Sequence, residues 1–567
     1  MPPPRTPGLS SNELCPATAR GLTGQTTHVI AEPPAPTLPD RTPPRPDMLD
    51  AVQQAIQNAE IDSVVNRLLS TQPEEQPRMA PVGEFDADIV VIGSGPGGYV
   101  AAIRAAQLGA RTVCIERDAA EWGGTCLNWG CIPTKAMIAS VERLHHVKTA
   151  GAMGVTIQGE VGFDFTKIMD RKQKIVTTLR GGVSGLLKSN HVRSVVGTAR
   201  FADANTIEVT GADGKTERIR AKSAIIATGS IPIMPPIPGL ERAPGDKRGE
   251  SSNGIWTSDE AVACKTRPDR LVMIGAGAIG LEFAYCFRGL GSEVDVVEIA
   301  PEILPVGDAE IAGELRKSLT KQGIRFHVGS KVTGVEHKDG VRLVTIEGPN
   351  GSKVVETDVV LCGAGRKPYF DGLGLDAAGV RTETEGPLSR RGVTVNEYLQ
   401  TSAPNIYAIG DVTGKLLLAH LGSHQGIVAA ENIMGHQVKM DYRAVPAPIY
   451  TYPEVASVGL TEEEARAAGN DVMTGRFPFR PLGRAMALNE QEGMVKIVAD
   501  RKYGEILGVH IIGPYATELI HEAVIAIKLE ATVEELMTNI HAHPTLSEAI
   551  GEAALDVKGD AIHKMKK

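Results

Sequence analysis

The first strand that the pattern of apolar and polar residues predicts lies at residues 88–92, which form an apolar, β-branched run. A glycine-rich sequence follows at 93–98, a helical pattern covers 99–108, and a second strand is predicted over 112–115. This order is typical of a Rossmann-like dinucleotide-binding fold, in which a pyrophosphate approaches the helix N-terminus and an acid after the second strand accepts from a ribose hydroxyl. The residues predicted to bind the first nucleotide in this way are Gly93, Gly95, Gly98 and Glu116.

The same order recurs in the middle of the chain. Residues 271–274 predict a strand, 275–280 predict a glycine turn with a helix that runs to Phe287, and 293–297 predict a further strand. The acid after that strand would repel a 2′-phosphate and no arginine follows it closely, so the sequence predicts NAD rather than NADP. Two such folds in one chain favour a flavin and a nicotinamide that exchange a hydride. The residues predicted to bind the second nucleotide are Gly275, Gly277, Ile279, Gly280 and Glu298.

The region before the first strand has a different composition. Twelve of the 36 prolines precede Met48 and few aliphatic residues accompany them, so we expect residues 1–47 to be disordered. Residues 48–84 are expected to form an amphipathic helix, over 48–70, and a linker. The helix would either pack on the chain's own surface or dock on a partner. Met48 and Met79 are candidates for the true start, a hypothesis that the intact mass of the native protein would test.

Length and composition limit the class of protein. The 567 residues suffice for three or four domains, and 42% of them are hydrophobic. The net charge of −9 and the lack of a basic stripe with aromatic residues argue against a nucleic-acid partner. The longest apolar stretch, 271–287, contains Glu282 and several glycines, so we expect no membrane span. Seven scattered cysteines are typical of a reducing compartment, and we expect a cytoplasmic protein.

One pair of cysteines is close enough in the sequence to act together. Cys126 and Cys131 are separated by four residues within the segment 123–135. A structural zinc site needs four ligands, and no second pair is present to complete one, so we expect no metal. Two inert buried thiols are the other alternative. Otherwise this spacing can bring both sulfurs within disulfide reach on one helical turn, which predicts a dithiol that cycles beside a flavin.

The sequence Gly-Gly-Thr-Cys-Leu-Asn-Trp-Gly-Cys-Ile-Pro-Thr-Lys at 123–135 resembles the redox motif of the class I flavin-dependent disulfide oxidoreductases. Within that family it is most similar to the members that oxidise dihydrolipoamide. The resemblance covers the chain from Phe85 to its last residue. The further segments that resemble the family are 227–230, 365–368, 408–411, 452–456, 513–522 and 541–548.

The resemblance implies an α/β fold with two Rossmann-like dinucleotide-binding domains, a central region and an α+β dimerisation domain. It also implies one non-covalent FAD per subunit, NAD+/NADH as the second nucleotide, and a homodimer with shared active sites. The expected boundaries are 85–230 for the FAD-binding domain with the cysteine pair, 231–365 for the NAD-binding domain, 366–440 for the central domain that completes the FAD site, and 441–567 for the interface domain.

The resemblance assigns roles to single residues as well. Cys126 is implied to be the interchange thiol that meets the substrate, and Cys131 the thiol that lies against the flavin. Lys135 is implied to lie near the flavin with Glu282 as its ion partner. Further FAD contacts implied by the family are Thr125, Lys135, Thr228, Gly229, Gly410, Asp411, Ala419 and His420, and further NAD contacts are Glu282, Gly365 and Arg366.

The segment 541–548 can also be interpreted from its chemistry. A histidine is suited to remove a thiol proton near neutral pH, and a carboxylate at the far ring nitrogen orients the ring and stabilises its charged form. His543 and Glu548 fit this pair, although a lone histidine is more often structural. His541 is a candidate for holding the substrate. In the family this histidine serves the active site of the opposite subunit, so a monomer should be inactive.

The function implied by the resemblance is the oxidation of protein-bound dihydrolipoamide to lipoamide, with NAD+ as the final acceptor. The partner would be a lipoyl-bearing acyltransferase or the carrier protein of glycine cleavage. Glutathione reductase is disfavoured by Glu298, mercuric reductase by the lack of cysteines after Cys362, and a soluble transhydrogenase by the cysteine pair. A flavoprotein that serves as a binding subunit is the alternative from another class. Three residues depart from the family pattern, namely Trp129, Leu421 and Gln425.

Overall fold

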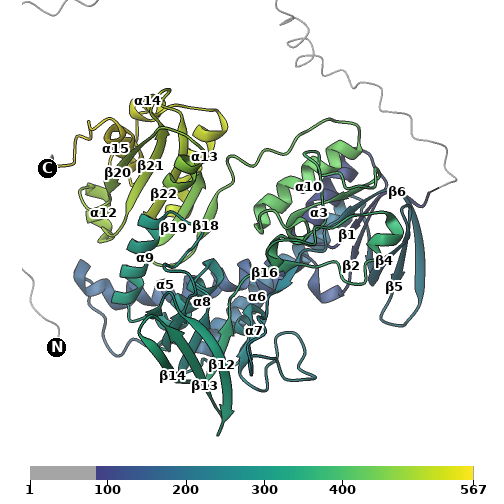
Figure 1. The fold of residues 1–567 in the computed structure, drawn as a ribbon, viewed down its shortest axis with the longest axis horizontal. Coiled ribbons are helices and arrows are strands. Elements are labelled where there is room, and N and C mark those ends of the chain that lie inside the picture. Colours follow the sequence, from purple (N-terminus) through teal and green to yellow (C-terminus); the bar gives the residue numbers. More distant parts are fainter. Residues whose placement is uncertain (1–84, 566–567) are drawn as a thin grey trace, which may run out of the picture. The chain divides into compact units, whose positions relative to one another are not determined.

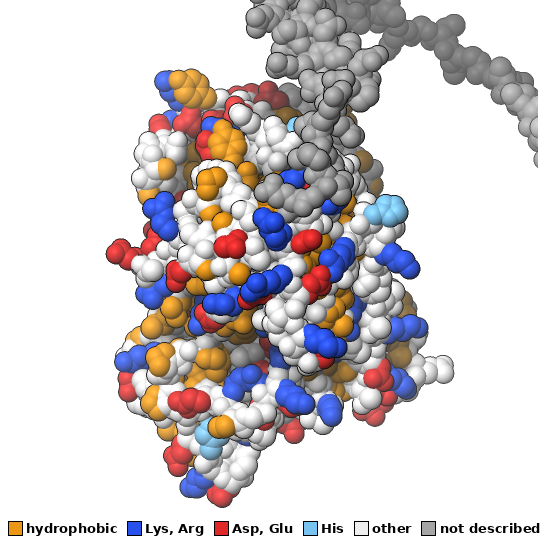
Figure 2. Space-filling model, turned by 90° about the vertical axis from the view of Figure 1, so that its right-hand side faces the viewer, with side chains coloured by type: hydrophobic (Ala, Val, Ile, Leu, Met, Phe, Trp, Pro, Cys, Tyr) orange, Lys and Arg blue, Asp and Glu red, His pale blue; other side chains and the backbone are white. Residues whose placement is uncertain are grey.

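The computed structural model describes residues 85–565 (Figure 1). The expectations for residues 1–84, which are the proline-rich extension, the amphipathic helix and the linker, lie outside the described residues. Among the helices between residues 85 and 565, none is both long and apolar enough to cross a membrane. On the face shown in Figure 2, Lys and Arg side chains are interspersed with Asp and Glu side chains.

Seven strands form the sheet of the first nucleotide fold. They are β1 (Ala87–Ile92), β2 (Thr112–Glu116), β3 (Arg193–Val196), β4 (Thr198–Asp203), β5 (Thr206–Thr210), β6 (Thr216–Ile226) and β17 (Ile406–Ala408). Their order is β3-β2-β1-β6-β5-β4, and β17 pairs with β6. Strand β1 is parallel to both neighbours and buried along its whole length, as its continuous apolar run predicts. A strand from a distant part of the chain therefore completes this sheet.

Three long helices belong to this fold, namely α3 (Pro96–Gln107), α6 (Phe165–Ser189) and α10 (Ala419–Ile433). Helices α3 and α10 pack against each other. A Cβ atom at Gly426 would lie 2.5 Å from the carbonyl oxygen of Gly97, so only glycine permits this approach. The close packing places the first turns of α10 next to the first glycine turn, where the Ser423 hydroxyl donates to the carbonyl oxygen of Pro96 at 3.2 Å.

The second nucleotide fold has a five-stranded parallel sheet. Its strands are β8 (Ile255–Trp256), β9 (Arg270–Ile274), β10 (Glu293–Val297), β11 (Arg325–His327) and β15 (Val359–Cys362), in the order β11-β10-β9-β15-β8. Its helices are α7 (Ser258–Ala263), α8 (Ala278–Gly289) and α9 (Ala309–Lys321). An antiparallel sheet of β12 (Lys331–Lys338), β13 (Val341–Gly348) and β14 (Gly351–Thr357) precedes β15.

Two short strands connect the nucleotide folds. Strand β7 (Ser230–Pro232) leaves the first fold and β16 (Arg366–Pro368) returns from the second. They pair in antiparallel register, with Ser230 opposite Pro368. The second nucleotide fold is therefore inserted into the first, and the crossing point lies at β7 and β16.

The last part of the chain forms an antiparallel sheet with helices. Its strands are β18 (Ala447–Ile449), β19 (Glu454–Gly459), β20 (Val472–Pro478), β21 (Met494–Asp500) and β22 (Ile506–Gly513), in the order β18-β19-β22-β21-β20. Its helices are α11 (Glu462–Ala467), α12 (Gly483–Leu488), α13 (Ala516–Lys528), α14 (Val533–Thr538) and α15 (Glu548–Val557). In the first sheet β4, β5 and β6 pair in antiparallel register, and its other pairs are parallel. This α+β unit and the two nucleotide folds confirm the predicted fold class.

Two further helices carry the cysteine pair. They are α4 (Gly124–Trp129) and α5 (Cys131–Thr149), and α5 packs against both α6 and α8. The short 3-10 helices are η1 (Ala119–Glu121), η2 (Ala150–Met153), η3 (Leu375–Ala378), η4 (Leu388–Arg390) and η5 (Gly410–Thr413). Helix α5 thus joins the first nucleotide fold to the second.

Candidate redox-active site

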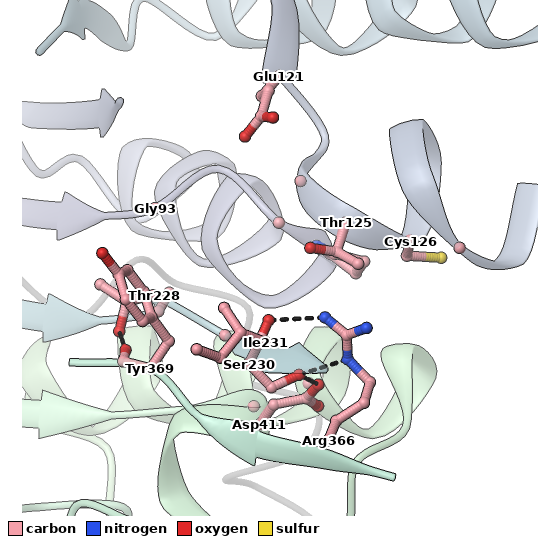
Figure 3. Close-up of a pocket in the computed structure, with 18 of the residues that line it drawn as sticks. Gly93, Glu121, Thr125, Cys126, Thr228, Ser230, Ile231, Arg366, Tyr369 and Asp411 are labelled. Carbon is pink, nitrogen blue, oxygen red and sulfur yellow. Dashed lines mark hydrogen bonds between the residues drawn. The ribbon is translucent and has the colours of Figure 1, made fainter. Parts of the chain in front are cut away.

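A cavity of about 590 Å³ contains the cysteine pair and many of the predicted cofactor contacts (Figure 3). The predicted site residues that line it are Gly93, Gly95, Glu116, Thr125, Cys126, Cys131, Lys135, Thr228, Gly229, Ile279, Glu282, Arg366, Gly410, Asp411 and Ala419. These residues come from both nucleotide folds and from the segment between them. The predicted site residues that do not line it are Gly98, Gly275, Gly277, Gly280, Glu298, Gly365, His420, His541, His543 and Glu548.

The first glycine turn leaves room for a phosphate group. A Cβ atom at Gly95 would meet nothing within 4 Å, whereas one at Gly98 would lie 1.8 Å from the carbonyl oxygen of Gly93. Open space therefore faces the free N–H groups at the start of α3, an arrangement that binds a pyrophosphate. Glu116 ends β2 and accepts from the backbone N–H of Ser94 at 3.0 Å and from its hydroxyl at 2.6 Å.

A buried carboxylate lies at the other side of this cavity. The hydroxyl of Ser230 donates to Asp411 Oδ2 at 2.6 Å, and Arg366 donates to Ser230 Oγ at 2.8 Å and to its carbonyl oxygen at 2.7 Å (Figure 3). Burial raises the pKa of Asp411. A buried carboxylate with one hydroxyl donor can accept further hydroxyl groups, which suits the ribityl chain of a flavin. Arg366, which the resemblance implies as an NAD contact, lines this cavity and donates its hydrogen bonds to Ser230.

Gln425 fixes the turn that carries this carboxylate. Its side chain is almost fully buried, its Oε1 accepts from the backbone N–H of Gly410 at 2.6 Å, and its Nε2 donates to the hydroxyl of Tyr442 at 3.0 Å. The sequence showed Gln425 only as a departure from a family pattern. Leu421, the neighbouring departure, is buried in the apolar core. His420 points to the carbonyl oxygen of Pro446, 2.8 Å from its Nε2, and lies outside the cavity.

The second glycine turn repeats the geometry of the first. A Cβ atom at Gly277 would meet nothing within 4 Å, while one at Gly280 would lie 2.0 Å from the carbonyl oxygen of Gly275. Glu298 follows β10 and accepts from the backbone N–H of Ala276 at 2.7 Å. Gly365 has a φ of +109°, which favours glycine. The residues present in the two turns and around Asp411 therefore fit two dinucleotides, a flavin in the first fold and NAD in the second.

The two cysteines come from two helices. We expected both sulfurs on one helical turn, but α4 ends at Trp129, Gly130 interrupts the helix, and Cys131 is the first residue of α5. Both are free thiols. A hydrogen bond from the Cys126 thiol lowers the pKa of Cys131, and the positive charge of Lys135 lowers it further. The position at a helix N-terminus favours the same thiolate.

An ion pair lies one turn after the second cysteine. Lys135 Nζ lies 2.6 Å from Glu282 Oε2 and 2.8 Å from Oε1, and it lies over the ring of Tyr450 at 4.6 Å from the centroid. Glu282 Oε1 also accepts from the backbone N–H of Tyr450 at 3.1 Å. The pair joins α5 to α8 inside the cavity. Glu282 thereby fixes the position of the positively charged Lys135 ammonium group near the cysteine sulfurs.

The histidine and glutamate of the last motif lie away from this cavity. Nδ1 of His543 lies 2.9 Å from Glu548 Oε1, and the backbone N–H of Thr545 donates to Glu548 Oε2 at 2.8 Å. The His543 side chain is 77% exposed. The side chain of His541, the candidate for holding the substrate, is only 10% exposed, and its Nε2 lies 2.9 Å from Glu522 Oε1. Within one chain the structure therefore keeps His543 apart from the cysteine pair.

Some cavity residues escaped sequence reasoning. Ser230, Arg248 and Asp259 line the cavity, but they lie in a short link, a loop and a short helix that carry no periodic pattern. Ser230, Arg366 and Asp411 each lie in a segment that resembles the family, but the segments do not show that these side chains meet, because Ser230 is more than 130 positions from each of the other two in the sequence. Only the folded arrangement of the two nucleotide folds brings these residues together.

The fold and this site define a class of protein that comparison with known proteins identifies. Residues 87–426 match the family model of the pyridine nucleotide-disulphide oxidoreductases, and residues 445–554 match the dimerisation domain of that family. The chain belongs to the pyridine nucleotide-disulphide oxidoreductase family, whose members are FAD- and NAD-dependent oxidoreductases. The dimerisation domain supports a homodimer.

Several relatives are similar over most of the chain. It is 45% identical to dihydrolipoyl dehydrogenase of Thermus scotoductus over 84% of this chain and 98% of that protein. It is 44% identical to mitochondrial dihydrolipoyl dehydrogenase of Pisum sativum over 85% of this chain and 93% of that protein. Among solved structures, LpdA of Mycobacterium tuberculosis is similar with a TM-score of 0.73 at 30% identity, over 82% of this chain and 99% of that one.

Proposed function

We propose that this protein is a dihydrolipoyl dehydrogenase, which oxidises protein-bound dihydrolipoamide to lipoamide with NAD+ as the final acceptor. The observation that carries the proposal is the pair Cys126 and Cys131, placed in one cavity with the Lys135–Glu282 ion pair. The similarity to dihydrolipoyl dehydrogenases over more than four-fifths of the chain supports the substrate. Glu298, at the second turn, supports NAD.

The cysteines perform the exchange of sulfur bonds. Starting from the Cys126–Cys131 disulfide, a substrate thiolate attacks the sulfur of Cys126, forms a mixed disulfide and releases Cys131 as a thiolate. The second thiolate of the same substrate then attacks the substrate sulfur that is bonded to Cys126. This closes the S–S bond of the lipoamide ring and releases Cys126 as a thiolate. The start of α5 and the charge of Lys135 stabilise the Cys131 thiolate.

The resident cofactor would be held by the first glycine turn, Glu116, Thr125 and Asp411, and NAD by the second turn and Glu298. When bound, FAD supplies the two-electron relay between the reduced cysteine pair and NAD+. The chain's own residues orient that relay: Asp411 accepts hydroxyl groups, Gln425 holds its turn, and Lys135 provides a fixed positive charge.

The base would come from the second subunit. His543 is largely exposed and lies outside the cavity of its own chain, while Glu548 orients its ring. We propose that the partner's copy of this pair takes the substrate proton, so that each active site is shared in the homodimer. The natural substrate would be the lipoyl group of an acyltransferase or of the glycine cleavage carrier protein. Seven scattered cysteines in so long a chain suit a reducing compartment such as the cytoplasm.

The purified holoenzyme tests this function directly. Dihydrolipoamide and NAD+ should give NADH, measured by its absorbance, and Cys126→Ser and Cys131→Ser should each abolish that turnover. Cys264→Ser, a substitution of another buried free cysteine outside the cavity, is the matched control and should keep activity. An enzyme that is loaded with FAD, reduces artificial acceptors with NADH, and yet leaves dihydrolipoamide unoxidised would contradict the proposal.

A further inference from the structure

Helix α4, which carries Cys126, is held at both of its ends by one group of side chains. Glu121 precedes the helix and Trp129 is its last residue. The same carboxylate oxygen, Glu121 Oε1, accepts from Trp129 Nε1 at 3.0 Å and from Arg248 Nη1 at 2.9 Å. A loop far along the chain therefore contributes to a clamp across this short helix.

Arg248 is the centre of the clamp. Its guanidinium carbon lies over the ring of Trp129, 4.7 Å from the centroid. Its Nε donates to Asp259 Oδ2 at 2.7 Å and its Nη2 to Thr125 Oγ1 at 3.4 Å. A stacked, hydrogen-bonded arginine of this kind holds a fixed orientation because its planar group is constrained on the ring and at its edges. We call Glu121, Trp129, Arg248 and Asp259 the α4 clamp.

The loop backbone is shaped to fit the indole ring. Gly249, the residue after Arg248, has a φ of +79°, and a Cβ atom there would lie 2.8 Å from Trp129 Cζ3 and 3.0 Å from Cβ of Ala263. Its backbone N–H donates to Glu260 Oε1 at 3.1 Å. A side chain at this position would push the loop away from the ring. The absence of a side chain at Gly249 therefore lets the loop backbone pack directly against the ring of Trp129.

We propose that the α4 clamp is a positioning device for the cysteine pair, which sets the separation of the Cys126 and Cys131 sulfurs and so the equilibrium between dithiol and disulfide. The sulfurs come from two helices, and α5 is held separately by the Lys135–Glu282 pair. A disulfide needs sulfurs about 2.0 Å apart. The more firmly α4 is held beside α5, the higher the effective concentration of one thiol at the other, and the more stable the disulfide.

None of the clamp side chains bonds to either sulfur, so they act as positioning residues rather than catalytic ones. The inference rests on the proposed function in one respect, which is that the pair cycles between two redox states. The relevant reaction is the exchange with a reference disulfide. Both cysteine thiols give up their hydrogens and two electrons, a sulfur–sulfur bond forms between them, and the reference disulfide becomes its dithiol.

The test measures this exchange on the holoenzyme. The protein is equilibrated without oxygen in mixtures of reduced and oxidised dithiothreitol, quenched by alkylation, and the disulfide fraction of the peptide with Cys126 and Cys131 is read by mass spectrometry. The variants are Trp129→Phe, which keeps a ring but loses the N–H bond to Glu121, and Arg248→Lys. The matched controls are Trp256→Phe in the core and Arg218→Lys in an exposed pair with Glu208.

Both clamp variants should lower the equilibrium constant for disulfide formation about threefold to tenfold, and a tenfold fall is about 30 mV for a two-electron couple. The controls should titrate like the wild type. Clamp variants that titrate like the wild type, or controls that shift equally, would overturn the clamp and leave the proposed function intact. A wild-type pair that forms no disulfide in any mixture would overturn both. If Trp129→Phe does not fold, Glu121→Gln, which keeps the acceptor oxygen but removes its charge, gives the same readout.

Discussion

The ammonium group of Lys135 lies 2.6 Å from the carboxylate of Glu282, one helical turn beyond Cys131. The two charges act on the Cys131 thiol in opposite directions: Lys135 lowers its pKa and Glu282 raises it. The effect of Lys135 on the pKa of Cys131 is therefore partly cancelled by that of Glu282. Either partner can be neutralised without a large change of shape.

Opposite effects are expected from the two neutralising substitutions. Glu282→Gln should lower the pKa of Cys131, and Lys135→Met should raise it. Below neutral pH the alkylation rate of Cys131 follows its thiolate fraction, so the first variant should react about threefold to tenfold faster than wild type and the second correspondingly slower. Iodoacetamide rates across pH, assigned to Cys131 by mass spectrometry, measure both. A shift in the same direction in both variants would disprove the electrostatic account.

A second prediction concerns the turn before α10. Gln425→Leu leaves the backbone N–H of Gly410 buried without its acceptor, at a cost of about 1–3 kcal/mol. The turn holds Asp411, so FAD should bind about tenfold more weakly, which the return of free flavin fluorescence on dilution measures. Gln425→Glu keeps an acceptor oxygen and is the matched control. Equal retention of FAD by the Leu variant and the wild type would show that the bond to Gly410 is not needed.

The fold was predictable because its signals are local. The run 88–92 and the turn 93–98 determine a strand and a turn from adjacent residues alone, and the structure has β1 and the start of α3 there. The repeat at 271–280 predicts the second fold for the same reason. Order along the chain was then enough to predict two dinucleotide-binding folds, but not the antiparallel strands β4 and β5 that extend the first sheet.

Among the distant contacts of the site, the Lys135–Glu282 pair was implied by the family resemblance alone, and other such contacts could not be predicted. Gly130 breaks the helix between the cysteines, and a spacing of four residues does not distinguish one helix from two. The Arg366–Ser230 contact forms where β16 returns beside β7, so it depends on how the second fold is inserted into the first. Arg248 lies in a loop without periodicity, and only tertiary packing brings it onto the ring of Trp129.

A third prediction concerns the dependence of stability on pH. Glu142 lies on α5, where burial and the charges of Glu454 and Glu490 raise its pKa to about 7, and Arg143 opposes this only in part. A carboxyl whose folded pKa is raised contributes stability that is complete below its ordinary pKa of 4.5 and is lost as pH rises through about 7. Glu142→Gln should therefore raise the melting temperature by a few degrees at pH 8 and by less at pH 5.5.

Calorimetry at the two pH values measures this difference. The exposed Glu160→Gln is the matched control, and its melting temperature should follow that of the wild type at both pH values. An equal gain in melting temperature for Glu142→Gln at pH 5.5 and pH 8 would mean that the Glu142 carboxyl is charged at both values. Its pKa would then not be raised by burial and by Glu454 and Glu490.

The last prediction tests whether each active site uses two chains. Cys126→Ser and His543→Gln each remove one required group, so each homodimer should have little lipoamide turnover. When the two variants are unfolded or dissociated together in equal amounts and reassembled, half of the dimers should contain one chain of each kind. If His543 acts on the cysteine pair of the partner, one of the two sites in such a dimer has both groups intact, and about one quarter of the wild-type activity should return.

An active site built within one chain predicts a different recovered activity. If His543 served the cysteine pair of its own chain, every site in the mixture would lack one group and no activity would return. A doubly substituted chain mixed with wild type is the control for reassembly: its mixed dimers have one missing group in each site under the shared geometry, so they should be inactive. Because Glu548 orients the His543 ring at 2.9 Å, Glu548→Gln should complement Cys126→Ser in the same way. Recovery in that mixture would place the whole histidine–glutamate pair, and not the imidazole alone, opposite the partner's thiols.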